Sequence, residues 1–314
     1  MLTRRQIRVK VMQCIYALAL SREGSLETQQ KFLNQSIAQT FTLYLLMLSL
    51  LRELHHLAAE RVQKGSRKYL KSPDDEVGNP LRLSENQLFL QLAENPLLKD
   101  ALAKRKLRQW YLNEEYVKIV LKDILESPLY REYANAPASY EADREFLTVA
   151  FREIIAPNQK IYDFLEDEGI TWVDDLPLVN TFLLKQLRKM KPGTPHTYFL
   201  PPLLKNEEDM EFARELLDKT LLRGADLEKE MEGKTPNWDK ERIAEMDAIL
   251  LKMAIAELLY FPSIPERVTI NEYLEIAKEY STPKSSIFIN GVLDKLIREY
   301  RESGRLKKTG RGLL

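Results

Sequence analysis

The sequence has little of the chemistry on which metal proteins and secreted proteins depend. One cysteine, Cys14, occurs among 314 residues, so an internal disulfide framework is excluded and a reducing compartment is favoured. Three histidines and one cysteine are too few for a plausible Cys/His metal site. Glycine occurs only 11 times, which favours helices over many tight turns. The composition therefore indicates a helical protein that needs no metal.

Long apolar runs and an excess of charge of one sign are also missing. The most apolar run, residues 41–51, is about half of the roughly 20 residues that a membrane span needs. The basic start lacks the apolar stretch and cleavage site of a signal peptide, so we expect a cytoplasmic protein. With 47 basic and 47 acidic residues, no field of the whole protein attracts anions. Any nucleic-acid site must therefore be a local patch.

The usual catalytic motifs are absent as well. The chain has no GxGxxG, GxxxxGK[ST], GxSxG or HExxH sequence. His55 and His56 are adjacent, so on a helix they point about 100° apart and cannot both face one ion. His196 lies in a proline-rich connector and is predicted to be a loop residue. We therefore expect no enzyme activity and no cofactor.

Apolar periodicity near 3.6 residues predicts helices along nearly the whole chain, and thus an all-α fold. A polar break is expected at 71–80, a connector at 189–204 and disorder over 303–314. Polar side chains suited to capping helix starts are Ser84, Asn113, Ser139, Thr171 and Asn206. Prolines expected in first turns are Pro96, Pro157 and Pro177. The last helices are predicted from about 239 to 260, 265 to 280 and 283 to 302.

The first predicted helix, over residues 3–20, carries cations at its leading end. Arg4, Arg5, Arg8 and Lys10 lie in its first turns, although a helix N-terminus favours acidic residues. An apolar seam runs beside them. Two interpretations remain open: the cations are a solvated helix start, or they face an anion such as a nucleic-acid phosphate.

The last predicted helix carries an aromatic side chain with two possible roles. Ile289, Val292, Leu293 and Leu296 form its apolar stripe, and Phe288 lies to one side of that stripe. The Phe288 ring could pack at the rim of the core, or it could be a platform on which a base stacks.

Several stretches resemble the NusB family of transcription antitermination factors. "VTINEYLEIAKEY" followed by "SSIFINGVLDKL" is similar to the end of these proteins, and the INE and NGVLD motifs have the family's spacing. "RIAEMDAILLKMAIAELLY", "EEDMEFARELL" and the arginine-rich "TRRQIRVKVMQCIYAL" resemble further family helices. The likeness covers residues 1–35 and 205–314. It implies a NusB-like all-α helical bundle, enlarged by an all-helical insertion of unknown role at 36–204.

The resemblance also implies a function. NusB-like proteins bind boxA, a single-stranded RNA element, together with NusE, a small ribosomal-subunit protein, and the pair modifies RNA polymerase to read through terminators. The positions that would contact RNA are Arg4, Arg5, Arg8, Tyr16, Thr282, Lys284, Ser285 and Phe288. The positions that would contact NusE are Asp247 and Lys252. Lys284 replaces an acidic residue of the family, which should strengthen contact with an anion.

The RNA-contacting positions lie at two helix starts that we expect to form one cradle. Arginines on the first helix would hold phosphates, and the hydroxyl-rich start of the last helix would seat another. A methyltransferase with a NusB-like domain is disfavoured, because the chain has no glycine-rich cofactor loop and its cysteine lies in the first helix. An alternative is a helical protein-interaction module that has lost RNA binding. Basic runs at 61–71 and 104–110 are solvated faces or further RNA contacts.

Overall fold

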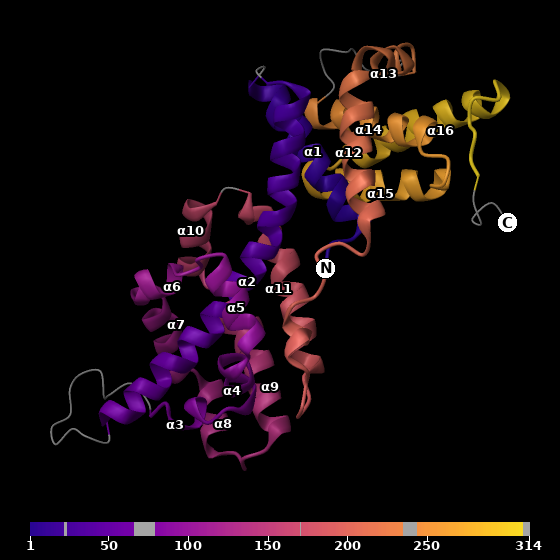
Figure 1. Cartoon of the computed structure of the whole chain (residues 1–314). Helices are drawn as coiled ribbons and strands as arrows, with labels where there is room; N and C mark the ends of the chain where they lie inside the picture. Colours follow the sequence, from indigo (N-terminus) through magenta and orange to yellow (C-terminus); the bar gives the residue numbers. More distant parts are fainter. Residues whose placement is uncertain (22–23, 66–78, 170, 235–243, 310–314) are drawn as a thin grey trace. The chain divides into compact units, whose positions relative to one another are not determined.

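The protein is built from helices alone in the ranges that the structure describes. This computed structural model describes residues 1–21, 24–65, 79–169, 171–234 and 244–309. Every regular element in these ranges is a helix (Figure 1). The prediction of an all-α fold is therefore confirmed.

The chain packs as two compact units, one formed by residues 1–37 and 203–314 (unit 1) and the other by residues 38–202 (unit 2). The helix α2, Leu26–Gly65, contributes its first turns to unit 1 and the rest to unit 2. The other helices of unit 1 are α1 Arg4–Ser21, α12 Glu207–Leu222, α13 Gly224–Met231, α14 Glu245–Tyr260, α15 Glu266–Tyr280 and α16 Ser285–Glu302.

Unit 1 is organised around α1 and α14. The helix α1 packs on α12, α14 and α15, while α14 also contacts α13 and α16. The predicted seam is buried at Ile7, Val11, Cys14 and Ile15. Burial raises the pKa of the Cys14 thiol to about 12, so this cysteine is a core residue with no thiolate character. These contacts hold the leading end of α1 beside the start of α15.

Among its described residues, unit 2 contains the long apolar part of α2 and ten shorter helices. These are α3 Leu81–Ser84, α4 Gln87–Glu94, α5 Pro96–Lys104, α6 Gln109–Leu112, α7 Glu114–Glu126, α8 Pro128–Asn135, α9 Tyr140–Ala150, the π-helix η2 Phe151–Ile155, α10 Gln159–Glu168 and α11 Trp172–Lys189. A 3-10 turn, η3 His196–Phe199, lies within the proline-rich connector. The buried carboxylate of Asp143 on α9 connects α3, α4 and α8 of this unit. It accepts hydrogen bonds from Arg82, Tyr133 and the Gln87 backbone.

Helix starts follow the sequence signals at some positions and not at others. Ser139 and Asn206 cap α9 and α12 with side-chain hydrogen bonds, and Pro96 is the first residue of α5, as predicted. Asn113 and Thr171 stand at N-cap positions without a capping hydrogen bond from the side chain.

Three other predicted start signals are wrong. Ser84 ends α3, and Asn86 caps α4 instead. Pro157 precedes α10 rather than entering it, and Pro177 lies inside α11. The start predicted near residue 239 and most of the polar break at 71–80 lie outside the described residues.

Residues 303–309, after α16, are tied to unit 1, contrary to the expected disorder, and residues 310–314 lie outside the described residues. The Lys308 amine donates to the backbone oxygens of Glu257 and Phe261 at 3.1 and 3.0 Å. The Thr309 backbone N–H donates to the Pro262 oxygen at 2.9 Å. Lys308 therefore satisfies carbonyl groups at the end of α14, where a helix favours a cation.

Length and apolar composition alone would let α2 cross a membrane, and among the described helices only α2 qualifies. The protein itself buries 67% of its most apolar window, as it would for the core helix of a globular protein. This feature is weak evidence for a membrane span.

Candidate nucleic-acid interface

Two arginines at the leading end of α1 are half-exposed and ion-paired. The Arg4 Nε donates to Asp209 on α12 at 3.1 Å. The Arg5 guanidinium donates two hydrogen bonds to Glu272 on α15, at 2.9 and 3.0 Å. The side chains of Arg4 and Arg5 are 41% and 37% exposed. Both cations therefore face solvent, and each has an acidic partner inside unit 1.

The third arginine, Arg8, belongs to the core. Its side chain is 2% exposed, and it donates two hydrogen bonds to Glu257 on α14, at 2.8 and 2.7 Å. Glu257 also accepts hydrogen bonds from the hydroxyls of Thr269 and Tyr273. Burial, and then the Glu257 charge, raise the pKa of Tyr273 well above its ordinary value. Arg8, predicted to contact RNA, is therefore buried against a carboxylate in this structure and is not exposed to a ligand.

A pocket of about 530 Å³ opens beside the exposed arginines. Its walls come from the first turns of α1, the loop before α15 and α15 itself. The lining residues are Thr3, Arg4, Arg5, Gln6, Arg8, Ser263, Ile264, Pro265, Val268 and Glu272. Phosphate oxygens accept hydrogen bonds in the same forked geometry as a carboxylate. The pocket can therefore offer two guanidinium groups to an anion that competes with Asp209 and Glu272.

Acidic side chains on α15 weaken the attraction of an anion to the pocket beside Arg4 and Arg5. The hydrogen bond with Glu272 raises the pKa of Arg5, and the charges of Glu275 and Glu279 act in the same direction. These glutamates follow one another at helical spacing along α15, toward the end that precedes Lys284. About 12 Å of helix axis separates Glu272 from the end of α15. The structure therefore does not join Arg5 and Lys284 in one continuous positive cradle.

The start of α16 exposes some of its predicted contacts and buries another. Thr282 and Lys284 are exposed. The Ser285 hydroxyl is buried and donates to Asp247 on α14 at 2.8 Å, and Ser281 donates to the same carboxylate at 2.6 Å. Ser285 and Asp247, predicted to contact RNA and NusE, are therefore both buried and paired within unit 1 in this structure. Both residues instead fasten α16 to the first turn of α14.

The remaining predicted residues also differ in exposure. Phe288 is 9% exposed, so its ring packs in unit 1 and does not offer a face to a base. Its neighbour Ile287 is 76% exposed. Tyr16 is half-buried on α1. The Lys252 side chain is 27% exposed and forms an ion pair with Glu228 at 3.4 Å.

Sequence reasoning missed the acids that hold the cations. Glu257 lies in the apolar run "AIAELL", and an isolated acid in such a run signals a buried cationic partner. In the described ranges no group of three or more His, Cys, Asp or Glu side chains is placed to hold a metal ion.

Comparisons with known proteins agree on one family. The family model described as the NusB family matches residues 183–298. A transcription antitermination protein NusB of Salinibacter ruber is 41% identical over 119 residues, which cover 38% of this chain and 74% of that protein. NusB proteins of Chloroherpeton thalassium and Geotalea uraniireducens are 40% and 38% identical over 104 and 96 residues.

The extent of these matches differs. The segments cover 33% and 31% of this chain, and 49% and 66% of the Chloroherpeton and Geotalea proteins. No solved structure matches the chain. The Salinibacter match, by contrast, combines high identity with nearly three quarters of the relative's length. The chain therefore belongs to the NusB family.

Proposed function

We propose that this protein is a cytoplasmic transcription antitermination factor that binds boxA-type single-stranded RNA together with NusE. In this role it joins the antitermination complex of RNA polymerase and supports the transcription of ribosomal RNA. The proposal draws on the three relatives, each named a transcription antitermination protein. It is a binding function, and no catalytic step is assigned to any residue.

One observation carries the RNA-binding part of the proposal. Along α1 every residue from Ile7 to Met12 is buried, yet Arg4 and Arg5 remain half-exposed beside a pocket. The Arg5–Glu272 ion pair is partly exposed, and such pairs contribute only about 0–1 kcal/mol. An RNA phosphate can therefore replace Glu272 as the acceptor of Arg5 at little cost, whereas displacing Arg4 from the buried Asp209 costs more.

The proposed contact set is smaller than the sequence suggested. Arg4 and Arg5 bind phosphates at the leading end of α1, and Lys284 with Thr282 supplies a second contact at the start of α16. Tyr16 supplies an aromatic edge on α1. Lys252 remains a candidate contact for NusE, because its side chain is partly exposed on α14.

Titration of the full chain with a fluorescent boxA-type RNA, with and without NusE, tests this function. With about three phosphate contacts, the slope of log affinity against log salt should be near −2, from about −0.7 per phosphate. The Arg4→Gln/Arg5→Gln variant should bind about tenfold more weakly, with unchanged helicity by circular dichroism.

Arg214→Gln/Arg298→Gln provides the matched control for that variant. Arg214 on α12 and Arg298 on α16 are exposed in unit 1, so their loss removes the same two charges away from the pocket. The affinity of this control variant for RNA should stay within about twofold of the parent. A flat salt response, or full affinity in the double variant, would place the RNA site elsewhere.

A second candidate is an interaction module of the transcription or ribosome-assembly machinery without RNA binding. The burial of Arg8, Ser285 and Phe288, together with the acids around Arg5, favours it. NusE binding without measurable affinity for RNA in the same titration would support this candidate over the first.

A further inference from the structure

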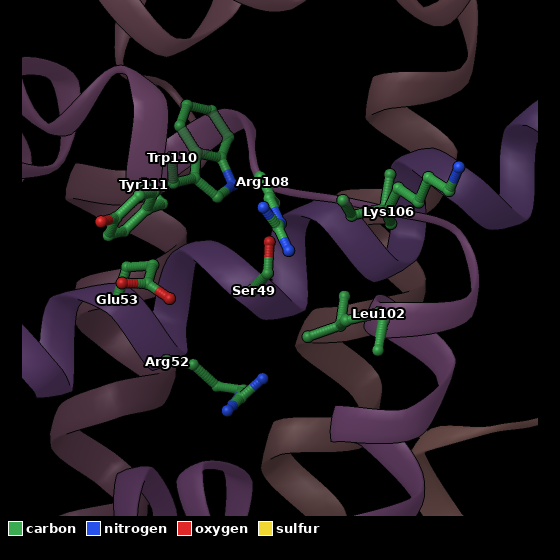
Figure 2. Close-up of a pocket in the computed structure, with 10 residues that line it drawn as sticks. Ser49, Arg52, Glu53, Leu102, Lys106, Arg108, Trp110 and Tyr111 are labelled. Atoms are coloured by element: carbon green, nitrogen blue, oxygen red, sulfur yellow. The ribbon is translucent and has the colours of Figure 1, made fainter.

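Unit 2 contains a basic pocket that the family likeness does not explain. The pocket has a volume of about 530 Å³ and lies between α2 and the segment from α5 to α6. Figure 2 shows Arg52 and Arg108 on either side of Ser49, with Leu102 facing them and Glu53 beside Tyr111. The ten residues that line it are Ser49, Arg52, Glu53, Leu102, Ala103, Lys106, Leu107, Arg108, Trp110 and Tyr111.

The cations of this pocket have donors that the protein leaves unused. The Arg52 Nε is buried and has no hydrogen-bond partner among the described residues. Within the same described ranges, no carboxylate lies within ion-pair distance of Arg52, Lys106 or Arg108. A buried N–H group without an acceptor destabilises the protein, so an anion that enters the open pocket would satisfy this donor.

The electrostatics of the pocket favour an anion. Glu53 is the one acid in the lining, against three cations. Lys104, the last residue of α5, and Arg105, which follows it, add two exposed cations. Burial lowers the pKa of Arg52, and the Glu53 charge opposes that shift. An arriving anion would favour the charged guanidinium and would satisfy its forked donors in two-point geometry.

The loop between α5 and α6 has a conformation that holds its cations at the pocket. Lys106 has φ of 55°, in the left-handed region that side chains other than glycine rarely adopt. The Arg105 guanidinium lies over the Phe41 ring, 5.1 Å from its centroid. Arg105 is therefore anchored to α2 and fixes the loop, while Arg108 stays available at the pocket.

Apolar and aromatic groups complete the pocket and narrow the class of ligand. Leu102 and Trp110 form a buried apolar wall, and the Trp110 indole N–H is held by the Leu46 backbone oxygen at 2.8 Å. Tyr111 is 74% exposed at the rim. A nucleotide combines a phosphate with a planar base that can stack on an exposed ring. An acidic peptide would use the cations but would gain little from the tyrosine.

We propose that this pocket is a second binding site for single-stranded RNA, in which Arg52 and Arg108 hold one phosphate and Tyr111 stacks a base. The site lies wholly within unit 2. It therefore does not rest on the RNA contacts proposed for α1, and it gives the insertion a role in binding the same class of ligand.

Binding of a fluorescent uridine 12-mer to the full chain, followed by anisotropy, tests the second site. Arg108 and Tyr111 are exposed, so their substitution leaves the core intact. The Arg108→Gln/Tyr111→Ala variant should bind about tenfold more weakly, since it loses one stacked base and one phosphate contact. Arg131→Gln, a change of equal charge on the exposed face of α8, should stay within about twofold.

Photocrosslinking with a 4-thiouridine 12-mer separates this site from the α1 site. Crosslinks within residues 102–111 that persist in the Arg4→Gln/Arg5→Gln variant would support the proposal even if α1 does not bind RNA. Crosslinks confined to unit 1, or parent affinity in the Arg108→Gln/Tyr111→Ala variant, would overturn it. Equal competition by polyglutamate, with no effect of Tyr111→Ala alone, would also overturn it in favour of an acidic polypeptide.

Discussion

The cations at the leading end of α1 and those of the pocket in unit 2 differ in the acidic partners that face them. Arg4, Arg5 and Arg8 each have a carboxylate partner within unit 1. Arg52 and Arg108 line a pocket in unit 2 without an ion pair among the described residues. The arginine-rich start of α1, which carries part of the family likeness, is thus more fully neutralised by acidic partners than the pocket of unit 2. Counting basic residues therefore does not locate an anion site, because pairing and burial decide which cations are available.

Breaking the buried pair of unit 1 should have the largest effect. Arg8→Met leaves Glu257 charged and buried, so the free energy of unfolding should fall by about 3–5 kcal/mol. Urea denaturation followed by circular dichroism measures this loss. Arg5→Met, which breaks the partly exposed pair with Glu272 on the same helix, should cost only about 0–1 kcal/mol.

The double variant Arg8→Met/Glu257→Gln checks the cause of that loss. It removes both charges, so it should be more stable than Arg8→Met alone. Equal losses in the single and double variants would mean that packing of the arginine stem, and not an uncompensated charge, dominates.

Removing the acidic partner of Arg5 should strengthen RNA binding. This effect is smaller than the loss of stability expected for Arg8→Met. Glu272→Gln removes the charge that holds Arg5, so affinity for boxA-type RNA should rise by about two- to fivefold at low salt. Anisotropy titration measures the change. Glu211→Gln is the matched control, since Glu211 is exposed on α12 and its loss changes net charge equally. If Glu272→Gln and Glu211→Gln strengthen RNA binding equally, the change in net charge is the cause, and the release of Arg5 makes no specific contribution.

The smallest effect concerns Lys308, a cation held by backbone oxygens. Burial lowers its pKa from 10.5 to about 8, with the Glu257 charge acting against the shift. The folded state thus releases this proton at lower pH than the unfolded state, so stability should rise between about pH 8 and 10.5. Because the amine is half-exposed, the gain should be well below about 1 kcal/mol.

Thermal unfolding of the parent and of Lys308→Met across this pH range measures the gain. The midpoint of the parent should rise relative to that of the variant as the pH increases. Parallel curves for the two proteins would show that Lys308 contributes nothing to the pH dependence.

Proline and polar caps explain why part of the fold could be predicted. Pro265 and the Pro283 region separate the last helices, and α15 and α16 begin within two residues of the predicted starts. Ser139 and Asn206 act through neighbouring backbone N–H groups, so their effect is visible in local sequence. Pro177 inside α11 was not predictable from such rules, because tertiary packing overrides a local preference.

The candidate site was less predictable than the helices that carry it. Arg8 meets Glu257 across 249 positions of sequence, and Ser285 meets Asp247 across 38. Periodicity identifies a helix face but not the partner that covers it. Phe288 lies beside the stripe on α16, yet it is buried because α16 packs on both α14 and α15.

Unit 1 is assembled from two segments that the ribosome makes far apart in time. At roughly 5–20 residues per second, about 11–45 s pass between the end of α1, at Ser21, and the start of α14, at Glu245. Residues 38–202 form a contiguous compact unit and can fold during that interval. During that interval the apolar seam of α1 lacks the surfaces of α12, α14 and α15 that bury it in the folded protein.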